Sequence, residues 1–171
     1  MAKGNRLQFD LDDEDVKLFC EEADEQLELL DNSLVQLEGE PDPELVQQIF
    51  RAAHTLKGSS ATIGHKKMAG LTHAMETVLD AVRQGKKRAN SEMVDALLAG
   101  LDALRVLAHE VVTRVDAGVD AAPLEANLLA TLESEDSPLR SASSAVTVGL
   151  SYAMAAENIA AASAEFAEGR T

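Results

Sequence analysis

The sequence predicts an all-α fold: an antiparallel four-helix bundle with an additional C-terminal helix. Apolar residues recur at steps of three and four over five segments, which is the spacing of amphipathic helices. Trp is absent and aromatic residues make up 3% of the 171 residues, so Leu, Val and Ala supply most of the apolar content. No strand pattern of comparable length is present, and short connections favour antiparallel neighbours.

The first helix follows the acidic cluster Asp10–Asp15, and acidic residues stabilise a helix N-terminus. Gly39 and Pro41 end it. The second helix begins at Asp42 and Pro43, a cap followed by proline at the first helical position, and it ends at Gly64. The apolar stripes of these two helices are Val16, Phe19, Ala23, Leu27, Leu30, Leu34 and Leu37, and then Leu45, Ile49, Ala52, Ala53, Leu56, Ser60 and Ile63.

Three further helices follow in the same way. The third ends at Gly85, Ser91 is the expected cap of the fourth, and Pro123 lies near the start of a shorter fifth helix, expected at one end of the bundle. Their stripes are Met68, Leu71, Met75, Val78 and Val82; Val94, Leu97, Leu101, Leu104, Ala108, Val111 and Val115; and Leu124, Leu128 and Leu132. We therefore expect one domain over residues 1–133. Residues 134–171 begin Ser-rich with Pro138 and continue with small residues, so we interpret them as a linker and tail.

Charge and composition exclude several classes of partner. The net charge of -15 disfavours nucleic acid and anionic membrane surfaces. No apolar run approaches the roughly 20 residues of a membrane span, and the N-terminus lacks a signal-peptide apolar region, so we expect a cytoplasmic protein. Cys20 is the single cysteine and lies in an apolar stripe, which predicts a buried thiol. Residues 51–88 are locally cationic, with eight bases and two acids.

The candidate chemistry lies on the second helix. At 100° per residue, His54 points about 140° away from the apolar face centred near Ile49 and Leu56, so its side chain should be exposed. Gly58 lies one turn further on and leaves the surface beside His54 bare. Because glycine within a helix costs about 1 kcal/mol relative to alanine, this pairing indicates a site that another protein approaches closely.

Counting from the turn near His65 brings a second helix into the site. His54 precedes this turn by 11 residues and Glu76 follows it by 11, so the two should lie at the same height. Lys57 and His73 form the next layer, eight residues on either side. A carboxylate at Glu76 could accept a hydrogen bond from the imidazole and fix its tautomer, while Lys57 and His73 could stabilise phosphoryl oxygens.

The segment His54–Gly64, with the run Ile49–Ala53 before it and Leu71–Glu76 after it, resembles the histidine phosphotransfer (HPt) family. It is most similar to the N-terminal phosphoacceptor domain of CheA-type chemotaxis histidine kinases, over roughly residues 9–133. The resemblance implies that His54 is the phosphoacceptor and Glu76 its hydrogen-bonding carboxylate. It also implies that Lys57 and His73 are accessory polar residues and that Gly58 leaves room for the partner.

The resemblance further implies a carrier in a two-component phosphorelay. Such a domain accepts phosphate from the catalytic domain of a histidine kinase and donates it to the aspartate of a response-regulator receiver domain. It is not an enzyme on its own and holds no cofactor, because the partners bind ATP and magnesium. The chain would be either a free-standing carrier or the front piece of a CheA-type kinase.

Two alternatives from other classes remain open at this point. His54, His73 and Glu76 could supply three ligands to a zinc-like ion, although the repeated Glu-x-x-His pairs of di-iron bundles are missing. The chain could also be a passive helical interaction module, which would explain the bundle but not Gly58 or the layered polar residues.

Overall fold

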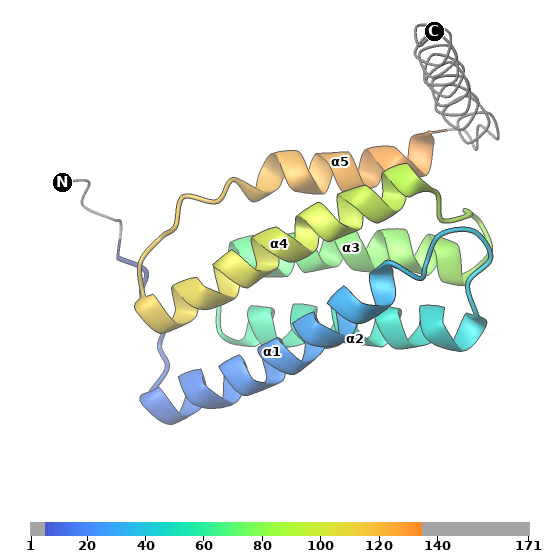
Figure 1. Cartoon of the computed structure of the whole chain (residues 1–171). Coiled ribbons are helices and arrows are strands. Elements are labelled where there is room, and N and C mark those ends of the chain that lie inside the picture. The colour runs from blue at the N-terminus through green and yellow to red at the C-terminus, as the bar shows by residue number, and fades with distance from the viewer. Residues whose placement is uncertain (1–5, 135–171) are drawn as a thin grey trace, which may run out of the picture. The chain divides into compact units, whose positions relative to one another are not determined.

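The computed structural model describes residues 6–134, which form five helices in the predicted order (Figure 1). Their bounds are α1 Asp13–Leu34, α2 Pro43–Thr62, α3 Lys66–Arg83, α4 Ser91–Thr113 and α5 Ala121–Glu133. Within residues 6–134, the β-type pairing is limited to one isolated bridge between Arg6 and Val115. The all-α prediction is therefore confirmed. The predicted linker and tail, apart from Ser134, lie outside the described residues.

Helices α1 to α4 form the expected up-and-down bundle. Each packs against two neighbours, α1 against α2 and α4, and α3 against α2 and α4, so the four close a ring around one core (Figure 1). The largest fully buried side chains come from all four helices and the adjoining segments: Leu30, Leu34, Leu37, Ile49, Leu56, Met68, Leu71, Met75, Leu79, Met93, Leu97 and Leu101. The predicted stripes thus face this core, with Val16, Leu45, Ile63 and Val82 half-buried at its edge.

We expected the fifth helix at one end of the bundle, and this expectation is wrong. The helix lies lengthwise along α3 and α4 (Figure 1). Two glycines lie under it. A Cβ at Gly70 would lie 2.6 Å from Glu125 Oε1, and one at Gly100 would lie 3.3 Å from Met75 Sδ and 3.7 Å from Leu128 Cδ1. The fifth helix thus packs closely over Gly70, and its Leu128 is completely buried.

Side-chain caps begin every helix, and one of them differs from the prediction. Asp12, Asp42 and Asp120 accept hydrogen bonds from the first backbone N–H groups of α1, α2 and α5. At α4 the cap is Asn90, whose Oδ1 accepts from Met93 N at 2.9 Å, and Ser91 is the first helical residue. The prediction of Ser91 is wrong by one residue, because asparagine caps at least as well as serine.

Two other predicted positions are corrected. Val115 lies beyond the end of α4 and is exposed, because the helix stops at Thr113 and Arg114 takes a left-handed backbone with φ of 54°. Cys20 is half-buried rather than buried, since it lies at the edge of the core. This partial burial is the main reason that the pKa of its thiol is raised, and nearby Asp24 raises it further.

The turn between α2 and α3 is anchored by a buried polar pair that the sequence did not indicate. His65 caps α3 through Nδ1, and its Nε2 lies 3.1 Å from Leu107 O and 3.2 Å from Glu110 Oε2. Burial, the largest influence, lowers the pKa of His65. Phe9 stacks on the imidazole, and Arg114 binds the carbonyl oxygens of Phe9 and Leu11. These contacts hold the turn against α4 and so fix how far α2 and α3 can slide.

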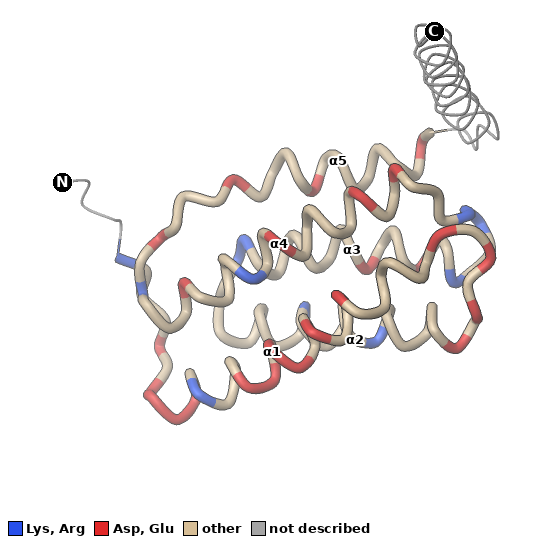
Figure 2. Tube along the Cα trace, in the orientation of Figure 1, with Lys and Arg blue, Asp and Glu red and all other residues tan. Residues whose placement is uncertain are grey.

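Charge is distributed as the sequence predicts. Acidic residues follow one another along α1 and the segment before it (Figure 2). The basic residues of segment 51–88 lie on α2, on α3 and in the loop after it. Several of these cations pair with acidic residues on other segments, for example Lys67 with Asp116 and Arg88 with Glu40.

Candidate functional site

His54 and Glu76 meet across the α2–α3 pair, as the counting from the turn predicts. His54 Nδ1 lies 2.8 Å from Glu76 Oε1. The two side chains differ sharply in exposure: 62% of the His54 side chain is accessible, against 13% of Glu76. The carboxylate is therefore held within the interface between the helices, and it presents the imidazole outward.

Lys57 binds the other oxygen of the same carboxylate. Its Nζ lies 2.5 Å from Glu76 Oε2, so Glu76 bridges two residues that are one helical turn apart on α2. Burial is the largest influence on the pKa of Glu76 and raises it, but the hydrogen bonds from Lys57 and His54 together outweigh burial. The pKa of Glu76 consequently lies below its ordinary value of 4.5. The carboxylate is ionised at neutral pH.

An ionised carboxylate decides which nitrogen of His54 is free. A carboxylate can only accept a hydrogen bond, so Nδ1 must carry the proton that lies between the two groups. In the neutral imidazole, Nε2 then holds the unshared electron pair. Because the ring projects from the surface, this nitrogen is directed to where another molecule can reach it.

The remaining predicted site residues are placed less centrally. His73 is exposed on α3, and among the described residues its side chain has no hydrogen bond or ion pair with His54, Lys57 or Glu76. Lys57 reaches down to Glu76 rather than across to His73. Gly58 is exposed, and a Cβ added there would meet nothing within 4 Å. Packing within the bundle therefore gives no reason for glycine at this position.

Two further residues extend the site and were not predicted from the sequence: Phe50 beside His54, and Arg83 beside Phe50. The ring of Phe50 stacks on the imidazole, with the centroids 6.2 Å apart and the planes at 21°. The guanidinium of Arg83 lies 4.2 Å from the centroid of the Phe50 ring. The sequence contained a signal for both residues. Phe50 precedes His54 by one helical turn on α2. Counted from the turn at His65, Arg83 lies level with Gln47, which is about one helical turn from Phe50.

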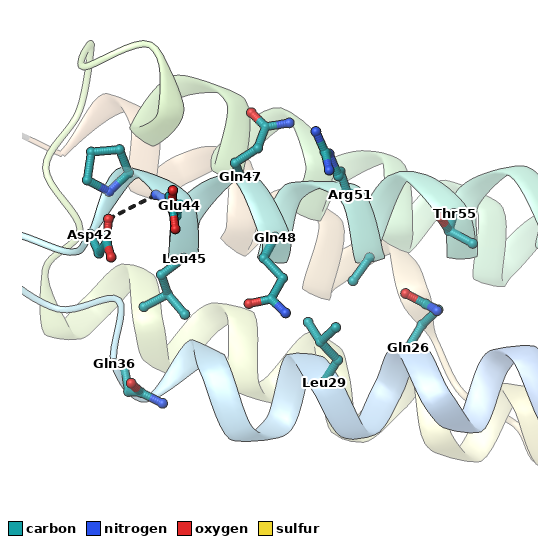
Figure 3. A pocket seen from close by; sticks show the side chains of 12 residues that line it. Gln26, Leu29, Gln36, Asp42, Glu44, Leu45, Gln47, Gln48, Arg51 and Thr55 are labelled. Atoms are coloured by element: carbon teal, nitrogen blue, oxygen red, sulfur yellow. Dashed lines mark hydrogen bonds between the residues drawn. The ribbon is translucent and has the colours of Figure 1, made fainter.

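A separate groove runs along the other side of α2. It has a volume of about 990 Å³ and lies between α1 and α2, lined by Leu29, Leu45, Arg51 and several glutamines (Figure 3). His54 does not line it. The candidate chemistry thus sits on an exposed face of the α2–α3 pair rather than in a pocket.

The arrangement of His54, His73 and Glu76 can be compared with that of a metal site. Within residues 6–134, no group of three or more His, Cys, Asp or Glu side chains is arranged to hold a metal ion. His73 in particular is not drawn in with His54 and Glu76. In the same part of the chain, no helix combines the length and apolar character needed to cross a membrane.

Comparison with known proteins identifies relatives over the whole bundle core. Residues 16–107 match the family described as the Hpt domain. The chain is 41% identical to the chemotaxis protein CheA of Bacillus subtilis over 112 residues, which are 65% of this chain and 17% of that protein. It is also 41% identical to the sensor histidine kinase CheAY of Helicobacter pylori over 103 residues, 60% of this chain and 12% of that protein. The chain therefore spans less than a fifth of the length of these curated relatives.

Solved structures show the same fold. The solution structure of the histidine phosphotransfer domain of CheA superposes with a TM-score of 0.65 at 32% identity, covering 76% of this chain and all of that one. The crystal structure of the phosphorylated P1 domain of CheA3 in complex with CheY6, from R. sphaeroides, gives a TM-score of 0.64 at 28% identity. It covers 71% of this chain and 98% of that one.

Proposed function

The chain belongs to the Hpt domain family, and on that basis we propose that it carries a phosphoryl group on Nε2 of His54 in a two-component phosphorelay. It accepts the group from the catalytic domain of a histidine kinase and donates it to a response-regulator aspartate. The observation that carries this proposal is the pairing of an exposed imidazole with a mostly buried carboxylate at 2.8 Å. This arrangement makes one ring nitrogen a nucleophile and leaves it accessible.

The transfer needs no proton movement at the attacking nitrogen. The electron pair of Nε2 forms the N–P bond while the bond from the γ-phosphorus of ATP to the bridging oxygen breaks. ADP leaves with the electron pair of that broken P–O bond. The Nδ1 proton stays in the hydrogen bond to Glu76, which offsets the positive charge that develops on the ring. In the second transfer, an aspartate oxygen attacks phosphorus and the electron pair of the N–P bond returns to Nε2.

Lys57 and Gly58 have distinct parts in this proposal. Lys57 holds Glu76 in place in the free domain and lies one turn from His54, from where its ammonium can approach phosphoryl oxygens once they are present. Gly58 leaves the surface beside His54 open to a partner. His73 is a weaker accessory candidate, because it is exposed on α3 but does not touch the other three.

The partners follow from the similarity of the chain to chemotaxis proteins. The related P1 domain from R. sphaeroides was crystallised phosphorylated and in complex with CheY6, which supports a receiver domain as the acceptor. We propose chemotaxis-type signalling, with ATP and magnesium bound by the kinase domain and the response regulator. In this proposal the domain is a carrier and not a catalyst on its own, and it acts in the cytoplasm together with these partners.

The experiment is phosphorylation with radiolabelled ATP and the catalytic part of Bacillus subtilis CheA, freed of its own Hpt region. The wild-type chain should be labelled, and the label should pass to a chemotaxis receiver domain. His54→Gln should stay unlabelled, whereas the matched control His109→Gln, an exposed histidine on α4, should behave as wild type. Equal labelling of His54→Gln and wild type would reject the assignment.

A further inference from the structure

The exposed imidazole of His54 poses a problem of orientation. Its hydrogen bond to Glu76 fixes one ring atom, Nδ1, but it leaves the plane of the ring free to tilt about that point. With 62% of the side chain accessible, few neighbours restrain the ring on the outer side. A partner that delivers phosphorus in line with the Nε2 electron pair needs the plane to be defined as well, because misplacement of a reacting atom by about 1 Å can cost orders of magnitude in rate.

Phe50 provides a second contact to the imidazole, besides the hydrogen bond from Nδ1. It lies one turn before His54 on α2, and its ring stacks on the imidazole at 6.2 Å and 21°. Aromatic pairs at this separation attract one another and prefer defined angles. Phe50 is itself partly buried against the core, so it offers the imidazole a surface that does not move freely.

Arg83 secures Phe50 from the neighbouring helix. Its guanidinium lies 4.2 Å from the ring centroid, within the range of a cation–π contact. Asp80 fixes the guanidinium in turn, accepting from Nε at 3.1 Å and from Nη2 at 2.6 Å. The chain of contacts from Asp80 through Arg83 and Phe50 to His54 therefore ties the ring plane to α3, the helix that also supplies Glu76.

We propose that Phe50, held by Arg83, is a positioning residue that sets the plane of the His54 imidazole for phosphoryl transfer between docked proteins. This inference rests on the proposed function of His54. A positioning role affects two kinds of phosphodonor differently, whereas a merely structural role would affect both equally. A docked kinase approaches from a fixed direction and requires a defined plane of the imidazole. A small, freely tumbling phosphodonor can adapt to any orientation of the ring.

The test compares these two donors on Phe50→Leu, which keeps an apolar side chain but loses the flat face. With the catalytic part of Bacillus subtilis CheA and ATP, kcat should fall about fivefold with KM for the domain unchanged. With phosphoramidate, followed by ³¹P NMR, the rate should stay within about twofold of wild type. Phe50→Tyr keeps the ring and should restore the kinase rate.

Controls separate positioning from stability and from the proposed function. Phe19→Leu removes a buried ring from α1, which carries no residue of the site, and should leave both rates unchanged. Arg83→Gln alters a partly exposed residue and should lower the kinase rate about twofold. It takes the place of Phe50→Leu in the comparison of donors if Phe50→Leu proves too unstable to assay. The same relative rates for Phe50→Leu and Phe19→Leu, or equal slowing with both donors, would overturn the inference.

A measurement without phosphate keeps the two proposals apart. In the free wild-type domain, NMR should show nuclear Overhauser contacts between the Phe50 and His54 ring protons. ¹³C relaxation should show a His54 ring that is more ordered than in Phe50→Leu. If wild type accepts no phosphoryl group from either donor, the proposed function fails, but the difference in ring order between wild type and Phe50→Leu is still measurable. If the phosphoryl group is accepted but the order of the His54 ring is unchanged in Phe50→Leu, the positioning role alone fails.

Discussion

At the scale of single residues, Glu76 is the most constrained member of the site. It accepts from His54 with one oxygen and pairs with Lys57 through the other, while only 13% of its side chain is accessible. Sequence counting predicted that it lies level with His54, because both helices rise uniformly from one turn. Its bridge to Lys57 was not predictable in the same way, since counting placed Lys57 level with His73. A long flexible side chain is free to reach the neighbouring layer.

Glu76 should make stability depend on acid pH. Its pKa in the folded protein lies below the ordinary value of 4.5, so its contribution to stability is fully present above that value and is lost as pH falls through the lower one. We expect Glu76→Gln to be less stable than wild type at pH 7, and the difference to shrink below about pH 4.5. Urea unfolding at a series of pH values between 3 and 7 measures this. An equal difference at pH 3 and pH 7 would contradict it.

Gly58→Ala should separate folding from partner binding. A Cβ at this position meets nothing, so the substitution should stabilise the isolated domain by about 1 kcal/mol through helix propensity. The added methyl group lies beside His54, so KM with the kinase should rise. Urea unfolding and the labelling assay measure the two effects, with Ala61→Gly on the exposed face of α2 as the converse control. Greater stability with unchanged KM would show that no partner approaches there.

At the scale of the helices, caps and turns set the boundaries more strictly than the apolar stripes do. The stripes predicted five helices in the right order, because the period of 3.6 residues is a repeated signal. Individual ends were less predictable, since Asn90 and Ser91 are adjacent and both are suitable caps. The contact of His65 with Glu110 was not predictable, because a histidine at a turn and a glutamate 45 residues later have no common pattern.

The cap of α4 gives a test at this scale. Asn90→Ala removes the acceptor for Met93 N and should cost about 1 kcal/mol of unfolding free energy, while Asn90→Asp should cost little. Ser91→Ala is the matched control, since the Ser91 hydroxyl donates to Glu38 on the surface and caps nothing. Chemical denaturation of the three variants measures the differences. A larger loss in Ser91→Ala than in Asn90→Ala would contradict the assignment of the cap.

At the scale of the whole described bundle, the sequence predicted the four-helix core but misplaced the fifth helix. The stripe of α5 is short, and only Leu128 of its predicted apolar positions is completely buried. The close packing of α5 over Gly70 of α3 was not predictable, because a glycine adds nothing to a periodic apolar signal. The positions of His54 and Glu76 were predictable, because both can be counted from the single turn that joins α2 to α3.

Leu128→Ala tests how much the packing of α5 against the bundle contributes to the free energy of unfolding. Removal of a completely buried leucine typically costs about 2–5 kcal/mol. We expect a loss in that range in a single cooperative transition, because α5 contacts both α3 and α4. Leu129→Ala, a neighbouring exposed leucine, should change stability by less than about 0.5 kcal/mol. Thermal and urea unfolding measure both variants, and similar losses would show that α5 is loosely docked.

The connection between α2 and α3 is only three residues long, from Ile63 to His65, and its last residue is buried against α4. A gene that gained or lost one codon there would shift one helix along the other by about 1.5 Å or turn it by about 100°, and would part His54 from Glu76. The connection from Arg114 to Asp120 joins α4 to α5, and neither of these helices carries His54, Lys57 or Glu76. Over generations, insertions and deletions should therefore accumulate in the later connection, while the earlier one keeps its length even in lineages whose surfaces have diverged.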